Sequence, residues 1–466
     1  MKEKMFSKET YVARRESLKK RMKSGLLIFP GNKETGMNYK DNWYPFRQDS
    51  TFLYYFGINL PDLYVLIDLD NDKEILFGDD LTPEDFVWVG AVEPLSTYAE
   101  KSGIAEVQPM AKLEAYIKNA QQKAQPLHYL PPYRNKVTIE ISNLTGIPVN
   151  EVEAKKSTEF TKAVIAQRSI KSAEEIKEIH KAVNITAAMH RHAIKWTKHG
   201  VTEKQIAGEL QAIAIAGGGN ISFPIILTKN GQYLHNHATQ AVVENGDIVL
   251  CDCGAETAMN YAGDMTRTFP VAERFTAIQR EVYSIVLDAH ESAAAALKPG
   301  YLFKDAHLLA CSRIVEGLKD LGLMKGDTQE AVNAGAHTLF FQCGLGHFMG
   351  MDVHDMENFG EQLVGYTDDL EKSTEFGLKS LRLGKALEEG NVLTVEPGIY
   401  FNPFLIDSWK SQGKYTDFVN YDEVEKFKTF GGMRVEEDFL ITANGKELLG
   451  DPLAKTIEEI EELKNS

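Results

Sequence analysis

The chain has 466 residues, more than a single hydrophobic core usually serves, so we expect two domains. Its 51 basic and 67 acidic residues give a formal charge of -16, which disfavours a polyanion such as nucleic acid as a partner. Apolar runs such as residues 25–29 are short, and none approaches the roughly 20 residues that a membrane-spanning helix needs, so no membrane partner is expected.

The N-terminal stretch and the cysteines indicate the compartment. Residues 1–21 are charged and lead into no apolar segment with a cleavage site, so we expect no secretory signal. Four cysteines are too few for a disulfide framework and fit a reducing compartment, so the expected location is cytoplasmic. A metal-binding Cys251-x-Cys253 pair is the weaker interpretation, because the cysteines of a zinc site usually stand roughly two to four residues apart.

Up to about residue 160 the sequence alternates short apolar runs with turn-forming residues, and helical stretches lie between the runs. Runs such as 63–69 and 73–78 are typical of strands, which predicts a mixed α/β domain. Near residue 170 the pattern changes, because Ser172 and Glu175 form a capping box ahead of apolar residues at helical spacing. We therefore expect one domain at 1–167 and a second at 168–466.

The second domain contains an internal repeat. Two predicted helices meet at residues 198–200, two more meet at residues 298–300, and strand-like runs follow each pair. This pattern predicts a duplicated unit with helices outside and a curved antiparallel sheet inside, an α+β fold. The strands of both halves would then face one central cleft.

Four predicted strands each carry an acid where a core strand should be apolar: Asp252, Asp264, Glu396 and Glu436. Buried, unpaired carboxylates are costly, so these acids imply either a cation or a network of salt bridges. Asp252 and Asp264 are symmetric about Ala258, and a hairpin turning there would place them directly opposite, roughly 5 Å apart at Cβ. The alternative is that some of the acids lie on the outer face of an edge strand.

The segment "GLGHFMGMDVHD" at 344–355 places two histidines among glycines and acids. His347 would add a nitrogen ligand to the four carboxylates, and this oxygen-rich set suits Mn²⁺, with Zn²⁺ or Co²⁺ as alternatives. For His354 the alternative is a core histidine that is hydrogen-bonded to Asp352 or Asp355.

With these motifs the chain resembles the pita-bread metallopeptidases that act on Xaa-Pro bonds, prolidase and aminopeptidase P. The resemblance runs from about residue 172 to 450, and a weaker likeness joins the N-terminal part to the creatinase-like N-terminal domain of the same enzymes. The motifs are "LCDCGAE", "YAGDMTRTFP", "GLGHFMGMDVHD", "TVEPGIYF", "GGMRVEEDFLIT" and, in the N-terminal part, "YPFRQDSTFLYYFGI".

The resemblance implies two divalent metal ions. It makes Asp252 a ligand of one ion and Asp264 and Glu436 bridging ligands. His347 and Glu396 become ligands of the other ion. The ligand set that the resemblance implies agrees with the set that the buried acids suggest.

The resemblance also implies catalytic and substrate-binding roles. Glu396 would move a proton from the attacking water to the prolyl nitrogen, while His354 and His235 bind the substrate and the developing oxyanion. For His235 the alternative is a solvated loop histidine. The chain departs from the family pattern at Cys343, where a histidine is usual, and at Asn236, where an aromatic residue is common.

Three further residues are assigned to substrate binding by the same resemblance. Arg382 matches the prolidase arginine that meets the C-terminal carboxylate of a dipeptide, although an exposed helix-end arginine is the alternative. Arg434 belongs to "GGMRVEED". Trp88 matches an aromatic residue that in relatives reaches the active site of a neighbouring subunit, which predicts a homodimer, and burial in the core of its own domain is the alternative.

The sequence therefore predicts a dinuclear, metal-dependent peptidase that acts on small peptides with proline in the second position. A dipeptidase is favoured by the segment around Arg382, and an aminopeptidase that acts on longer peptides is the alternative. A remote alternative is a non-catalytic pita-bread binding module, which loss of metal ligands would mark.

Overall fold

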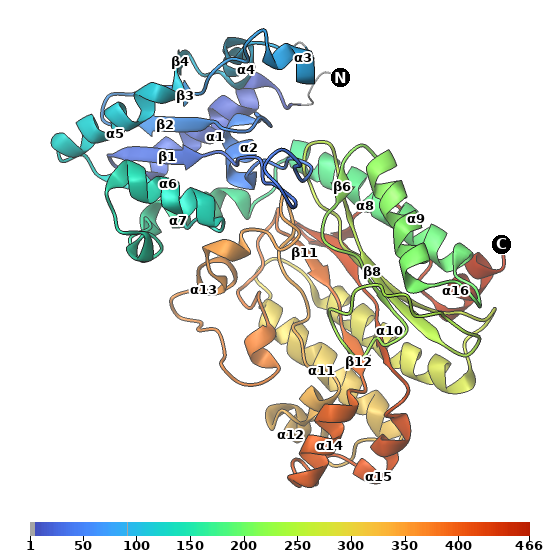
Figure 1. The fold of residues 1–466 in the computed structure, drawn as a ribbon. Coiled ribbons are helices and arrows are strands. Elements are labelled where there is room, and N and C mark those ends of the chain that lie inside the picture. The colour runs from blue at the N-terminus through green and yellow to red at the C-terminus, as the bar shows by residue number, and fades with distance from the viewer. Residues whose placement is uncertain (1–4, 91) are drawn as a thin grey trace. The chain divides into compact units, whose positions relative to one another are not determined.

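The computed structural model describes residues 5–90 and 92–466 (Figure 1). The chain divides into two compact units, residues 1–168 with 358–360, and residues 169–357 with 361–466. Among the helices in the described ranges, none combines the length and apolar character needed to cross a membrane.

The first unit is built on a five-stranded mixed sheet in the order β4-β3-β2-β1-β5. The central strands β1 to β3 are antiparallel, while β4 and β5 pair in parallel at the two edges. The expected strand runs are β2 and β3, so the prediction of a mixed α/β unit is confirmed. Its strands are β1 (Leu26–Pro30), β2 (Tyr64–Asp68), β3 (Lys73–Phe77), β4 (Glu106–Gln108) and β5 (Leu127–Tyr129). Its helices are α1 (Lys8–Arg21), α2 (Ser50–Phe56), α3 (Asp85–Val89), α4 (Leu95–Ser102), α5 (Leu113–Gln122), α6 (Asn135–Thr145) and α7 (Thr158–Arg168).

Two helix pairs frame the second unit. Helices α8 (Ala173–Trp196) and α9 (Glu203–Ala216) form the first pair, and α10 (Ala277–Ala296) and α11 (Phe303–Asp320) form the second. The expected capping box of Ser172 and Glu175 opens α8. Gly200 and Gly300 end the two breaks at φ +92° and +81°, a region that favours glycine. The duplicated arrangement is therefore present.

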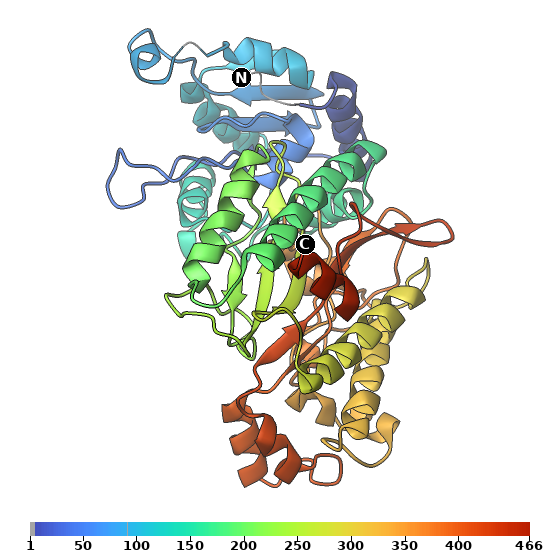
Figure 2. The same ribbon diagram turned by 90° about the vertical axis from the view of Figure 1, so that its right-hand side faces the viewer.

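The strands of the second unit lie inside the helix pairs, and Figure 2 shows both pairs on the same side of the strands. The sheets are β10-β8-β7, β11-β14-β15, β12-β13 and β6-β9. A bridge between Thr266 and Glu436 joins the strands of the two halves, as expected for a shared central cleft. The strands are β6 (Asn220–Ile221), β7 (Ile226–Thr228), β8 (Ile248–Cys253), β9 (Ala255–Glu256), β10 (Met265–Pro270), β11 (Val392–Val395), β12 (Gly398–Tyr400), β13 (Gly432–Arg434), β14 (Glu437–Thr442) and β15 (Gly445–Leu448). The remaining α-helices are α12 (Thr328–Asn333), α13 (Glu361–Gly365), α14 (Pro403–Ser411), α15 (Tyr421–Val424) and α16 (Ile457–Lys464).

The hairpin between β8 and β10 has a different register from the expected one. Asp252 pairs with Thr266, and not with Asp264, so the prediction that the two acids are directly opposite is wrong. The Thr257 amide donates to Tyr261 O at 2.9 Å, which centres the turn on residue 259 in place of residue 258. Asn260 adopts φ +59° in this turn, a left-handed conformation that asparagine tolerates well. A shift of two residues keeps both acids on one face of the sheet.

Candidate active site

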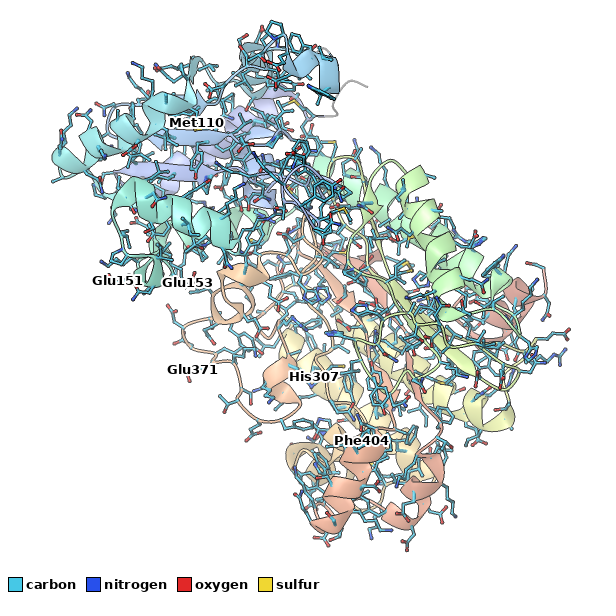
Figure 3. All side chains as sticks on the ribbon, in the orientation of Figure 1. Met110, Glu151, Glu153, His307, Glu371 and Phe404 are labelled. Atoms are coloured by element: carbon cyan, nitrogen blue, oxygen red, sulfur yellow. The ribbon has the colours of Figure 1, made fainter. Side chains whose placement is uncertain are left out.

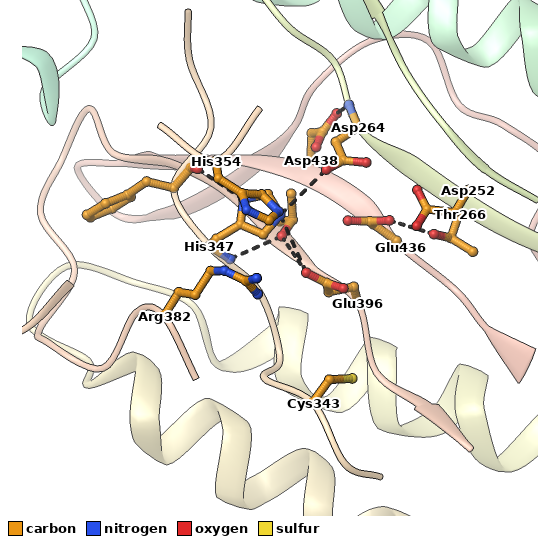
Figure 4. Close-up of polar contacts among 12 residues, drawn as sticks. Asp252, Asp264, Thr266, Cys343, His347, His354, Arg382, Glu396, Glu436 and Asp438 are labelled. Atoms are coloured by element: carbon orange, nitrogen blue, oxygen red, sulfur yellow. Dashed lines mark hydrogen bonds and ion pairs between the residues drawn. The ribbon is translucent and has the colours of Figure 1, made fainter. Parts of the chain in front are cut away.

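The predicted metal ligands converge on one cavity of about 300 Å³ in the second unit. Asp252 comes from the end of β8, and Asp264 directly precedes β10. Glu396 stands between β11 and β12, and Glu436 stands between β13 and β14. His347 comes from the glycine-rich loop, which a bridge between Phe348 and Leu393 attaches to β11. All five line the cavity, and Figure 4 shows them facing one another.

The imidazole of His347 is arranged as a metal ligand. Its Nδ1 donates to its neighbour's carbonyl, Phe348 O, at 3.0 Å, so a neutral ring keeps the Nε2 lone pair for another partner. Burial lowers the pKa of His347, which favours that neutral form. Nε2 lies 3.5 Å from Asp264 Oδ2 and 3.5 Å from Glu396 Oε1. Three electron-pair donors thus face one point, which fits a cation between them.

The carboxylates around this point are buried and crowded. Burial, followed by the neighbouring carboxylates, raises the pKa of Asp264 and Glu436 well above the ordinary carboxyl range. The Oδ1 atoms of Asp252 and Asp264 are buried and have no hydrogen-bond partner within residues 5–90 and 92–466. Ligand atoms of Asp264, His347 and Glu436 lie within 4.8 Å of one another. The orphaned oxygens and the oxygen-rich donor set therefore fit bound divalent ions.

Neighbouring polar side chains hold the carboxylates in place. Thr266 Oγ1 donates to Glu436 Oε2 at 2.6 Å, and the Asp264 amide donates to Asp438 Oδ2 at 3.1 Å. Arg434 forms an ion pair with Asp252 and donates from Nη1 to Tyr400 Oη at 2.9 Å. Arg434 lines the cavity, and these contacts give it a second task in orienting Asp252.

His354 lies beside His347, with ring centroids 4.1 Å apart (Figure 4). Its Nδ1 is hydrogen-bonded to Glu357, whose other oxygen accepts from Arg382 Nε at 3.0 Å. Asp355, one of the two alternative partners of His354, accepts from Lys171 Nζ at 2.7 Å. The Glu357 carboxylate stays ionised because, although burial alone would raise its pKa, the contacts with His354 and Arg382 lower it to about 2.

The remaining predicted site residues lie in two places. His235 and Arg382 line the cavity, and burial together with the nearby Arg434 cation lowers the pKa of His235. Cys343 also lines the cavity, in the position where the family histidine is usual. Trp88 belongs to the first unit, where it is 82% exposed on α3, so burial in the core of its own unit does not apply.

Sequence reasoning missed several residues of this site. Thr266 and Asp438 each stand two residues from a predicted ligand, so strand alternation could have placed them on the same face. Glu357 stands three residues after His354, a spacing that brings side chains together in a turn. His237, two residues from His235, also lines the cavity. Tyr400 gave no such signal, because its contact with Arg434 joins different strands.

Comparisons with known proteins agree with this geometry. The model of metallopeptidase family M24 matches residues 177–443, and that of the aminopeptidase P N-terminal domain matches residues 11–128. The chain is 32% identical over 447 residues to human Xaa-Pro dipeptidase, covering 94% of this chain and 88% of the relative. It is 31% identical over 443 residues to a probable Xaa-Pro aminopeptidase of Fusarium vanettenii, covering 94% of this chain and 92% of the relative.

Solved structures give the same result. The aminopeptidase PepP of Pseudomonas aeruginosa is similar with a TM-score of 0.81 at 26% identity, covering 99% of this chain and 98% of that chain. Zn-substituted aminopeptidase P of Escherichia coli in complex with product is similar with a TM-score of 0.80 at 27% identity, covering 99% of each chain. Because the M24 model matches more than half of the chain, the chain belongs to metallopeptidase family M24.

Proposed function

We propose that the protein hydrolyses the peptide bond that precedes proline in Xaa-Pro dipeptides. The observation that supports hydrolysis is the convergence of four carboxylates and the His347 imidazole on one cavity. Curated relatives named Xaa-Pro dipeptidase and Xaa-Pro aminopeptidase support the specificity for proline. A non-catalytic binding module is disfavoured, because all five ligand positions carry a metal-binding residue.

The residues that would hold two divalent ions are Asp252, Asp264, His347, Glu396 and Glu436. Oxygen ligands dominate this set, which suits Mn²⁺ before Zn²⁺ or Co²⁺. Ions bound here would supply Lewis acidity, which makes water a better nucleophile at neutral pH and polarises a carbonyl.

The protein's own groups would move the protons. The Glu396 carboxylate lines the cavity and can accept a proton from the attacking water and return it to the prolyl nitrogen. Glu357 accepts the Nδ1–H of His354, so His354 donates to the oxyanion from Nε2 as an imidazolium that Glu357 stabilises. His235 faces the same cavity as a second donor.

Arg382 is the residue that would favour dipeptides over longer peptides. Its Nε donates to Glu357, and the guanidinium lines the cavity, where its planar fork can pair with the C-terminal carboxylate of a dipeptide. A longer peptide would present a neutral amide at this position. The cavity of about 300 Å³ lies at the small end of ligand pockets, which also favours a short substrate.

The test is a comparison of Gly-Pro with Gly-Pro-Gly as substrates of the Mn²⁺-loaded protein. We expect a higher kcat/KM for the dipeptide. If the tripeptide is cleaved as well or better, the protein is an Xaa-Pro aminopeptidase, the alternative that several relatives favour.

We also infer a homodimer in the cytoplasm. Val87, Trp88 and Val89 are 78%, 82% and 60% exposed, a run of apolar side chains that a second subunit would cover. The four cysteines are all unpaired, as in a reducing compartment.

A further inference from the structure

A second group of side chains of metal-binding type lies in the core of the second unit. His307 and Cys311 stand four residues apart on α11, so they share one face of the helix. His337 comes from a 3-10 helix, Ala336–Leu339, that packs against α11. The ligand atoms of all three lie within 4.8 Å of one another, and His307 Nε2 is 3.4 Å from Cys311 Sγ. Figure 3 labels His307 on α11.

Three of the four ring nitrogens of His307 and His337 are buried without the hydrogen bonds that buried nitrogens normally make. His307 is 1% exposed and His337 is 2% exposed. Within residues 5–90 and 92–466, Nδ1 of His307 and both ring nitrogens of His337 have no hydrogen-bond partner. Burial lowers the pKa of His307 to about 3 and that of His337 to about 4, so both rings are neutral and keep a lone pair for a ligand.

A comparable group, His190 with Cys251 and Cys253, differs in the state of its histidine. His190 lies near Cys251 and Cys253, but its Nε2 is 2.9 Å from Met265 O and 3.4 Å from Cys253 Sγ. A carbonyl oxygen only accepts, so the Nε2 nitrogen near the Cys253 sulfur carries the proton and offers no lone pair. The other ring nitrogen, Nδ1, has no hydrogen-bond partner within the described residues, as in His307. The group of His307, Cys311 and His337 is distinguished by His337, both of whose ring nitrogens lack a partner in the part of the chain that the structure describes.

We propose that His307, Cys311 and His337 bind a thiophilic transition-metal ion such as Zn²⁺. Two neutral imidazoles and one thiolate form a donor set that this ion prefers. Burial raises the pKa of the Cys311 thiol, so the thiol would release its proton to solvent as the ion binds, and the ion would take one lone pair from each imidazole. This site is separate from the predicted catalytic ligands, none of which belongs to α11 or to the 3-10 helix.

The ion would serve the active site by holding a segment in place. Residues 336–339 lead directly into the loop that carries Cys343 and His347. The Phe341 ring lies 5.4 Å from that of His307, and Phe340 O accepts from the Tyr400 amide at 2.8 Å. An ion at His337 would therefore anchor the start of this loop to α11, a structural role.

The test uses Co²⁺ as a spectroscopic substitute for Zn²⁺, added to the metal-free full-length protein. A thiolate ligand produces a sulfur-to-cobalt charge-transfer band in the near ultraviolet, which carboxylates and imidazoles do not. We expect the band in the wild type and its loss in Cys311→Ser. It should persist in Cys343→Ser, a matched cysteine control from the cavity, and in Glu436→Ala, which removes a predicted catalytic ligand. No band in the wild type, or a band that survives in Cys311→Ser, overturns the proposal.

A second measurement covers the case in which Cys311→Ser does not fold. In the Glu436→Ala background, Zn²⁺ should raise the melting temperature, and the additional change His337→Gln should abolish that rise. An equal rise with and without His337→Gln contradicts the site.

Discussion

Glu357 accepts a hydrogen bond from the Nδ1 nitrogen of His354. The carboxylate is held from its other side by Arg382, so the imidazole has one fixed orientation, with Nδ1 on Glu357 and Nε2 as the nitrogen proposed to donate to the oxyanion. The acidic residue thereby links the predicted oxyanion donor to the predicted carboxylate-binding arginine.

Glu357→Gln is expected to weaken catalysis without loss of metal. A hydrogen bond to a charged group contributes about 1.5–3 kcal/mol, so kcat should fall about 10- to 100-fold. Because the Glu357 carboxylate raises the pKa of His354, which burial lowers, its removal should move the alkaline limb of the pH–rate profile to lower pH. The control is Glu361→Gln, which removes a carboxylate 3.8 Å from Arg382 Nε. An unchanged profile in Glu357→Gln would refute the role.

Metal content should distinguish the role predicted for His347, a metal ligand, from that predicted for His354, an oxyanion donor. Asp264→Ala, Glu436→Ala and His347→Ala should each lose metal and activity, measured by plasma emission spectroscopy on protein purified without chelator. His354→Ala should keep its metal and lose about 10²–10³ in rate, the usual effect of removing one oxyanion donor. A similar loss of metal in His354→Ala and His347→Ala would mean that the two roles are wrongly assigned, and full turnover in Asp264→Ala or Glu436→Ala would rule out a dinuclear centre.

Arg382→Ala is expected to lose more activity towards Gly-Pro than towards Gly-Pro-Gly, because only the dipeptide places a carboxylate at the guanidinium. The loss should appear in kcat/KM. Lys379→Ala, a nearby change outside the cavity lining, serves as the control. Equal losses for both substrates would remove the carboxylate-binding role.

The stability of the metal-free protein should depend on pH through its buried acids. The pKa of Glu436 is raised in the folded state, mainly by burial. At any pH between its unfolded-state and folded-state pKa, the folded protein therefore binds more protons than the unfolded chain, and it loses stability as pH rises through this range. As pH rises above the ordinary carboxyl range, the melting temperature of the metal-free wild type should therefore fall relative to that of metal-free Glu436→Gln. Added Mn²⁺ should restore the melting temperature of the wild type. If the melting temperatures of the two metal-free proteins change with pH in the same way, the raised pKa of Glu436 does not contribute to this pH dependence.

The exposed tryptophan provides a test of assembly. If Trp88 meets a second subunit, light scattering should show a dimer, and Trp88→Ala should weaken it. A matched change at an exposed aromatic residue of the second unit, Phe404→Ala, should leave the dimer unchanged. A fully active wild-type monomer at assay concentration would dispose of the proposal.

Features that depend on neighbouring residues were predictable from the sequence. The capping box at Ser172, the paired helices and the strands around the buried acids all follow from local periodicity and turn chemistry. The five motifs of the second domain, which occur in the family's order, also predicted which acids would meet, because such residues recur together in proteins of this fold. The predicted register of Asp252 and Asp264 in their hairpin was wrong, since the turn contains a left-handed residue, Asn260, and is centred one residue later than expected.

Contacts between distant segments were decided only by the tertiary structure. Arg434 reaches Tyr400 and Asp252 across three strands, and His337 meets His307 through the packing of a short helix on α11. No periodicity encodes these pairings, because each depends on how separate elements pack and on which polar atoms are left buried without partners. The sequence by itself determined the elements and the set of chemical groups, whereas tertiary packing decided which nitrogen, carboxylate or thiol each group faces.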